Sequence, residues 1–195
     1  MDSAPDHTGR DDGALLEALG IAQRLGVIGD TDLVAEIAHA RGYVAALTDL
    51  STGGWVLDIG SGGGLPGLVI AHDRPDLLVT LVDRREKRTD ILRRQVGRLS
   101  AAKPSVTATV VCAEVADISR PERGFDAITA RSFGPPEVTA KLAAPLLTLG
   151  GLLVVSDPPD TEASTRWTDE LLNQNFLERS IAPTGHRISV LRRAS

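Results

Sequence analysis

The chain has 195 residues, of which 42% are hydrophobic and 24% charged, and its formal net charge is −5 at pH 7. This length and composition predict one soluble globular domain, not two independent catalytic domains. The acidic total disfavours a generally basic, nonspecific nucleic-acid binder. No apolar run approaches the roughly 20 residues that cross a bilayer, so we expect no membrane partner.

The N-terminal region has two parts. Residues 1–13 are polar and lack the basic start and apolar core of a signal peptide, so we expect a flexible tail and a cytoplasmic protein. Apolar residues then recur at helical spacing over 14–25 and 31–47. These two segments predict a helical preface over 14–50.

Beyond residue 54, short β-rich runs alternate with helical segments. The strands are predicted over 55–59, 77–83, 106–112, 125–130 and 150–156, and the helices over 66–72, 86–99 and 136–147. Strands that are apolar on both faces and joined by helices indicate a parallel sheet with helices on both sides. Two further strand candidates, over 175–183 and 185–193, predict an antiparallel hairpin at a sheet edge.

These elements together predict an α/β fold with a seven-stranded, mostly parallel sheet that ends in an antiparallel hairpin. This is the Rossmann-like architecture of the class I methyltransferases. The core over 55–195 and the helical preface would form one domain over 14–195, which we expect to be monomeric.

Cysteine and histidine give no sign of a metal site. The single cysteine, Cys112, excludes an internal disulfide and a cysteine metal cluster, and its apolar run predicts a buried thiol. The four histidines have no ligand-like spacing. We therefore assign no metal.

The segment "VLDIGSGGGLPG", residues 56–67, places a glycine-rich turn between a strand and a helix. Glycines at such a turn allow positive φ and let a ligand approach the main chain. Gly62, Gly64 and Gly67 satisfy the G-x-G-x-x-G pattern of dinucleotide-binding proteins. That match alone leaves an NAD-dependent oxidoreductase open.

An acidic residue beside this turn favours a cationic ligand over a dinucleotide. Asp58 ends the strand, where its carboxylate would repel a pyrophosphate but suit a cationic ligand. S-adenosylmethionine carries a sulfonium and an ammonium group and no phosphate. Asp83 ends the next strand, 25 residues beyond Asp58, and fits the acid that accepts hydrogen bonds from ribose hydroxyls in both kinds of cofactor site.

Four segments indicate a more specific family of methyltransferases: "IGSGGGLPGL", "LVDRREKRTDILR", "CAEVADI" and "FDAITARSF". In order and spacing they resemble the small-subunit ribosomal RNA guanine-N7 methyltransferases, also called glucose-inhibited division protein B, over about residues 55–151. The resemblance implies S-adenosyl-L-methionine as cofactor and ribosomal RNA, or the small ribosomal subunit, as partner. It also implies a basic helix start over 84–88 that meets RNA phosphates.

The resemblance also assigns roles to matching residues. The cofactor would be bound by the two acids named above and by the loop residues Gly60, Ser61, Gly62, Gly64 and Leu65. Ala113 and Glu114 would meet the adenine edge. Arg131 would hold the cofactor carboxylate or position the substrate. Because guanine N7 has a lone pair and no proton, methyl transfer there needs alignment of the reacting atoms and no general base.

The chain departs from the family pattern on the substrate side. It has "AHARGYVAAL" where the family has an Asp-Ser pair, no clear Asn-Leu-Thr segment, and "VVSDPPD" where the family carries lysine and glycine. A diverged paralogue that methylates another RNA or a small molecule is therefore an alternative. A noncatalytic protein that binds the cofactor or the ribosome is another, because methyl transfer leaves little catalytic signature.

Overall fold

The computed structural model describes residues 12–158, 166–183, 185 and 187–194. Its strands are β1 (Trp55–Ile59), β2 (Leu78–Asp83), β3 (Ala108–Cys112), β4 (Phe125–Ala130), β5 (Leu147–Ser156), β6 (Leu177–Arg179) and β7 (Ile188–Arg193). Its α-helices are α1 (Gly13–Arg24), α2 (Leu33–Ala46), α3 (Gly67–Asp73), α4 (Glu86–Ala102), α5 (Pro136–Ala143) and α7 (Asp169–Gln174). Two 3₁₀ turns, Val115–Asp117 and Ala144–Leu146, complete the described elements.

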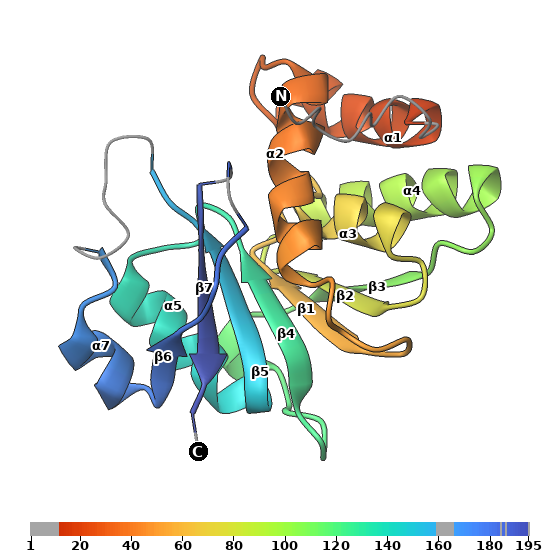
Figure 1. The fold of residues 1–195 in the computed structure, drawn as a ribbon. Helices are drawn as coiled ribbons and strands as arrows, with labels where there is room; N and C mark the ends of the chain where they lie inside the picture. The colour runs from red at the N-terminus through yellow and green to blue at the C-terminus, as the bar shows by residue number, and fades with distance from the viewer. Residues whose placement is uncertain (1–11, 159–165, 184, 186, 195) are drawn as a thin grey trace, which may run out of the picture.

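Within this described part of the chain, seven strands form one sheet in the order β3-β2-β1-β4-β5-β7-β6. The first five strands are parallel, and β7 runs antiparallel to both β5 and β6. Helices α3 and α4 lie on one side of the sheet and α5 and α7 on the other (Figure 1). The predicted Rossmann-like methyltransferase fold, including its C-terminal hairpin at a sheet edge, is confirmed.

Two hydrophobic cores lie on opposite faces of the sheet because side chains alternate along each strand. In β1, Val56 packs with α1, α2, α3 and α4, whereas Leu57 and Ile59 pack with α5 and α7. Asp58 falls between these two residues and therefore points to the α3 face. The alternation buries the whole of β1 apart from its first residue.

The N-terminal helices belong to the first of these cores. Helix α1 packs on α4 and α3, whereas α2 packs on α3 and also contacts β7, so α2 itself covers part of this face of the sheet. Helix α1 already begins at Gly13, and Asp12 pairs with Arg41 of α2. The remainder of the predicted tail, residues 1–11, lies outside the described residues.

Three details differ from the sequence-based expectations. Helix α5 ends at Ala143, four residues early, because a 3₁₀ turn containing Pro145 leads directly into β5. Helix α7, capped by the Thr168 hydroxyl, was not predicted. The expectation of a buried Cys112 was wrong: β3 is the outermost strand, its side chains are exposed or half-buried, and the Cys112 thiol is exposed.

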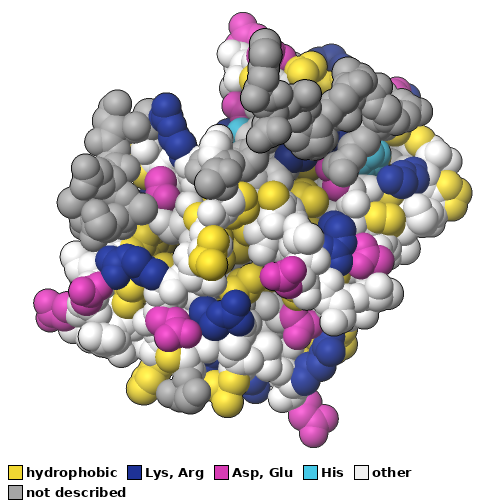
Figure 2. All heavy atoms as spheres, in the orientation of Figure 1, with side chains coloured by type: hydrophobic (Ala, Val, Ile, Leu, Met, Phe, Trp, Pro, Cys, Tyr) yellow, Lys and Arg dark blue, Asp and Glu magenta, His cyan; other side chains and the backbone are white. Residues whose placement is uncertain are grey.

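The molecular surface carries both charge signs. On the face that Figure 2 displays, positive and negative side chains are interspersed without one large patch of either sign. No helix in the described segments is long and apolar enough to cross a membrane.

Candidate functional site

The glycine-rich turn leaves β1 at the carboxyl edge of the parallel strands, where ligands of open α/β sheets bind. Gly60 has a φ of +67°, and a Cβ at this position would lie 2.7 Å from Cδ2 of Phe133. Gly67 begins α3, and a Cβ there would lie 2.3 Å from Cδ2 of Leu81 and 2.7 Å from Oδ2 of Asp58. Glycine is therefore required at one end of the turn by its φ and at both ends by close packing.

Asp58 lies beneath this turn and is only 1% exposed. The Thr129 hydroxyl, directly across the β1–β4 pair, donates to its Oδ1 at 2.6 Å. Its Oδ2 makes no hydrogen bond with any described residue. Burial is the main cause that raises the pKa of Asp58 to about 6. A buried negative charge under the loop is thus only partly compensated.

Asp83 ties the same turn to α4. Its Oδ2 accepts a hydrogen bond from the Gly62 amide at 3.0 Å, and its Oδ1 accepts one from the Arg85 amide at 2.9 Å. The Arg88 guanidinium lies 3.5 Å from Oδ2. Because each carboxylate oxygen has two acceptor positions, Asp83 still has capacity for hydroxyl donors from a ligand.

Three cavities lie side by side at this edge of the sheet. The α4 cavity, of about 500 Å³, is lined among others by Gly60, Asp83, Ala113 and Glu114. The loop cavity, of about 430 Å³, is lined among others by Gly60, Ser61, Gly62, Leu65 and Arg131. The β5 cavity, of about 590 Å³, is lined among others by Glu36, Arg131, Ser156, Asp157, Arg166 and Arg187. Ser132 lines all three, so they meet at this residue.

Most of the site residues predicted from the sequence line the α4 cavity or the loop cavity. Two do not. Asp58 lies below the turn, and Gly64 serves packing, since a Cβ at its position would lie 2.4 Å from Cδ1 of Leu68. The structure therefore brings the predicted residues to one edge but gives these two a supporting position.

The end of β4 carries the residues at which the cavities meet. Arg131 forms an ion pair with Glu36 of α2, and the Thr31 hydroxyl donates to the other Glu36 oxygen at 3.1 Å. Ser132 has a φ of +51°, which is uncommon outside glycine and concentrates at functional sites. The ring of Phe133 covers Gly60.

Sequence reasoning missed Glu36. A single glutamate on an amphipathic helix carries no sign of a partner that lies far along the chain, so no signal in the sequence could have found it. Phe133 was noted only for its position beside Arg131, and its contact with Gly60 follows from the fold.

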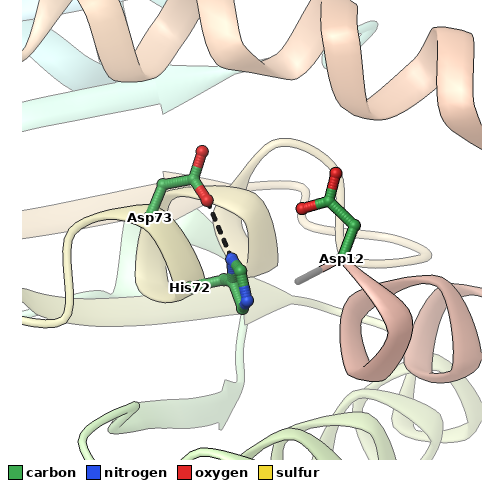
Figure 3. Close-up of side chains that lie close together, drawn as sticks. All are labelled: Asp12, His72 and Asp73. Atoms are coloured by element: carbon green, nitrogen blue, oxygen red, sulfur yellow. Dashed lines mark hydrogen bonds and ion pairs between the residues drawn. The ribbon is translucent and has the colours of Figure 1, made fainter. Parts of the chain in front are cut away.

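A group of metal-ligating side chains lies elsewhere, between α1 and α3. Atoms of Asp12, His72 and Asp73 come within 4.8 Å of one another (Figure 3). Arg41 donates to Asp12 at 2.6 Å and to Asp73 at 2.9 Å, so a cation already compensates both carboxylates. We infer that this cluster is structural and holds α1 and α2 against α3.

The sheet order and the glycine turn define the class I methyltransferase fold, and solved structures agree. The chain is similar to magnesium protoporphyrin IX methyltransferase from Synechocystis PCC 6803, with a TM-score of 0.66 and 17% identity over 97% of this chain and 100% of that one. It is also similar to a predicted O-methyltransferase from Agrobacterium tumefaciens, with a TM-score of 0.58 and 20% identity over 79% and 80% of the two chains.

Sequence similarity gives the family. Residues 36–177 match the model of rRNA small subunit methyltransferase G, and the protein belongs to this family. Ribosomal RNA small subunit methyltransferase G of Laribacter hongkongensis is 39% identical over 58% of this chain and 52% of its own length. The Sorangium cellulosum protein of the same name is 35% identical over 76% and 62%. The chain thus spans about half to three fifths of the length of these relatives.

Proposed function

We propose that the protein transfers the methyl group of S-adenosyl-L-methionine to N7 of a guanine in small-subunit ribosomal RNA. The observation that carries this proposal is the meeting of three cavities at Ser132, at the carboxyl edge of the sheet. Two of them contain the residues expected to bind the cofactor, and the third is available for the acceptor. Action on the small ribosomal subunit would place the protein in the cytoplasm.

The residues present fit this cofactor. Asp83 has acceptor capacity for ribose hydroxyls, and Ala113 with Glu114 would border the adenine in the α4 cavity. The glycine turn and Arg131 would hold the methionine part in the loop cavity, above the buried charge of Asp58. A cationic ligand is favoured there because it compensates that charge.

The same contacts argue against a dinucleotide. In a dinucleotide site the amides of the turn bind the pyrophosphate. Here the Gly62 amide donates to Asp83 instead, and two carboxylates lie beside the turn. A pyrophosphate would have to compete with one carboxylate for that amide and approach both negative charges.

Methyl transfer to guanine N7 requires the protein to position the methyl donor and the acceptor. S-adenosylmethionine, when bound, supplies an electrophilic methyl group on its sulfonium. Guanine N7 offers a lone pair without a proton, so no side chain has to act as a general base. The protein would have to hold the acceptor in the β5 cavity. The ion pair with Glu36 fixes the Arg131 side chain, which lines both that cavity and the loop cavity.

The test begins with calorimetric titration of the wild-type protein with S-adenosylmethionine, S-adenosylhomocysteine and NAD. We expect the first two to bind and NAD not to bind. Small ribosomal subunits that lack the modification are then incubated with labelled cofactor, and the label is located by nuclease digestion. Label in 7-methylguanosine supports the proposal, binding without transfer identifies a noncatalytic cofactor-binding protein, and binding of NAD alone refutes the cofactor assignment.

A matched pair of arginines at the two ends of β4 tests the site itself. Arg131→Gln removes the guanidinium at the junction, and Arg123→Gln removes one at the opposite edge, where it pairs with Asp126. We expect Arg131→Gln to lose about 10- to 100-fold in kcat/KM, the effect of one charged hydrogen bond, and Arg123→Gln to keep it. Equal activity of the two variants would contradict the assignment.

A further inference from the structure

The β5 cavity is the part of the site that the cofactor residues do not explain. Its walls come from α2, from the ends of β4 and β5 and from the segment before β7, and three arginines line it: Arg131, Arg166 and Arg187. Two carboxylates, Glu36 and Asp157, line it as well. Among the described residues that line the cavity, arginines therefore outnumber carboxylates by one, in a protein whose formal net charge is −5.

Two of these arginines are already paired. Arg131 is paired with Glu36. The Arg166 Nη1 donates to the Ser156 carbonyl at 2.7 Å and lies 3.6 Å from Asp157 Oδ1. Arg166 is consequently held at the cavity with a side-chain exposure of 17%, while most of its five N–H donors make no hydrogen bond with the described residues.

Asp157 organises this group from a nearly buried position. Its side chain is only 8% exposed, and its Oδ2 accepts a hydrogen bond from the Ser189 hydroxyl at 2.8 Å. Its amide donates to the Arg187 carbonyl at 2.9 Å, which fixes the main chain of Arg187 beside the end of β5.

Arg187 is the cation in excess. Its side chain is exposed, and its guanidinium makes no hydrogen bond or ion pair within the described residues. An anion that enters the β5 cavity would meet the Arg187 guanidinium together with the spare donors of Arg166. Guanidinium groups bind phosphate oxygens in bidentate geometry, and such charged hydrogen bonds are about twice as strong as neutral ones.

We propose that Arg166 and Arg187 form a phosphate-binding subsite that takes a phosphodiester group of the acceptor RNA next to the nucleotide to be methylated. The inference rests on the proposed function, since it identifies the β5 cavity as the acceptor cavity. It assigns recognition of a polynucleotide to two residues that lie outside the cofactor site.

The variants are Arg187→Gln and Arg166→Lys, with Arg192→Gln as the matched control. Arg187 directly precedes β7, whereas Arg192 lies near the other end of that strand, where it donates to the Gly150 carbonyl. Arg187 is exposed, so its replacement does not endanger the fold. Arg166→Lys keeps the charge of a half-buried residue and loses only the bidentate geometry.

The experiment measures methyl transfer to undermethylated small subunits at several KCl concentrations, with cofactor affinity measured separately by calorimetry. For Arg187→Gln we expect kcat/KM to fall about 10- to 100-fold, mostly through KM, and cofactor affinity to remain that of the wild type. The slope of log kcat/KM against log salt should decrease by about 0.7 to 0.9, the value for one phosphate contact. Arg166→Lys should also raise KM, and Arg192→Gln should match the wild type.

Different results would refute the phosphate subsite and the proposed function. If the wild type methylates guanine and Arg187→Gln keeps both its KM and its salt slope, the phosphate subsite is wrong and the proposed function stands. If the wild type binds the cofactor but transfers no methyl group to the subunits, the proposed function is wrong, and the subsite is overturned with it.

Discussion

The buried carboxylate of Asp58 should make the stability of the protein depend on pH. Its pKa is about 6 in the folded protein against an ordinary value of 3.8, chiefly because burial disfavours the charged form. The folded state therefore binds a proton at this site more tightly than the unfolded state does. The free energy of unfolding should fall as pH rises from about 4 to about 6, and the penalty should be complete at pH 7.

The size of this effect follows from the shift. About 2 pKa units at about 1.4 kcal/mol each correspond to ~3 kcal/mol of destabilisation at neutral pH. Asp58→Asn removes the ionisation and retains the oxygen that accepts from the Thr129 hydroxyl. The amide that it introduces in place of Oδ2 shifts the free energy of unfolding by an amount that does not depend on pH. The informative quantity is consequently the difference between the two proteins at each pH.

Urea denaturation from pH 4 to pH 8, followed by the fluorescence of the two tryptophans, measures this difference. Relative to Asp58→Asn, the wild type should lose ~2 kcal/mol between pH 4 and pH 7, because part of the penalty is already present at pH 4. A difference that stays constant over this range would refute the reasoning. The wild type should also bind S-adenosylmethionine more tightly above pH 6, because a nearby cation favours the carboxylate, and the variant should lose that pH dependence.

The remaining predictions concern the turn and the end of β4. Gly60→Ala and Gly62→Ala both place alanine at positive φ, but only the first brings a Cβ to 2.7 Å from Phe133, the nearest contact of the second being 3.6 Å. Calorimetry should therefore show a larger loss of cofactor affinity for Gly60→Ala. The buried Tyr43 hydroxyl donates to the Ala130 carbonyl at 3.1 Å, so Tyr43→Phe should lower the free energy of unfolding by about 1 kcal/mol. Burial raises the pKa of this single tyrosine, so tyrosinate absorbance at alkaline pH should appear only with unfolding.

The strands could be predicted from the sequence because their apolar runs are long enough to be buried on both faces. The five parallel strands start and end within three residues of the predicted ranges. Cys112 shows where this reasoning fails: the composition of β3 resembles that of the inner strands, and only the sheet order reveals that it lies at an edge. Helix α7 had a usable signal, a threonine followed by two acids at its start, but only six residues of helix.

For the candidate site, the sequence predicted the position of the turn and its two acids but not how deeply these acids are buried. Asp58 lies one residue before the end of β1, and Asp83 ends β2. Both side chains take the α3 and α4 face of the sheet and both are buried, at 1% and 5% exposed, but only Asp83 lines a cavity. This difference depends on what covers each side chain, which does not follow from spacing along the chain.

The contacts made by α2 suggest why the site could not be derived from the glycine turn alone. This helix lies before the turn in sequence and provides Glu36 to Arg131 and the Tyr43 hydroxyl to the carbonyl of Ala130. Both contacts act on the end of β4, beside the residue at which the three cavities meet. The proposed reaction needs no general base and depends on position, and the residues that would set that position carry no catalytic signature. Helix α2 therefore belongs to the candidate site and is not a separate attachment to it.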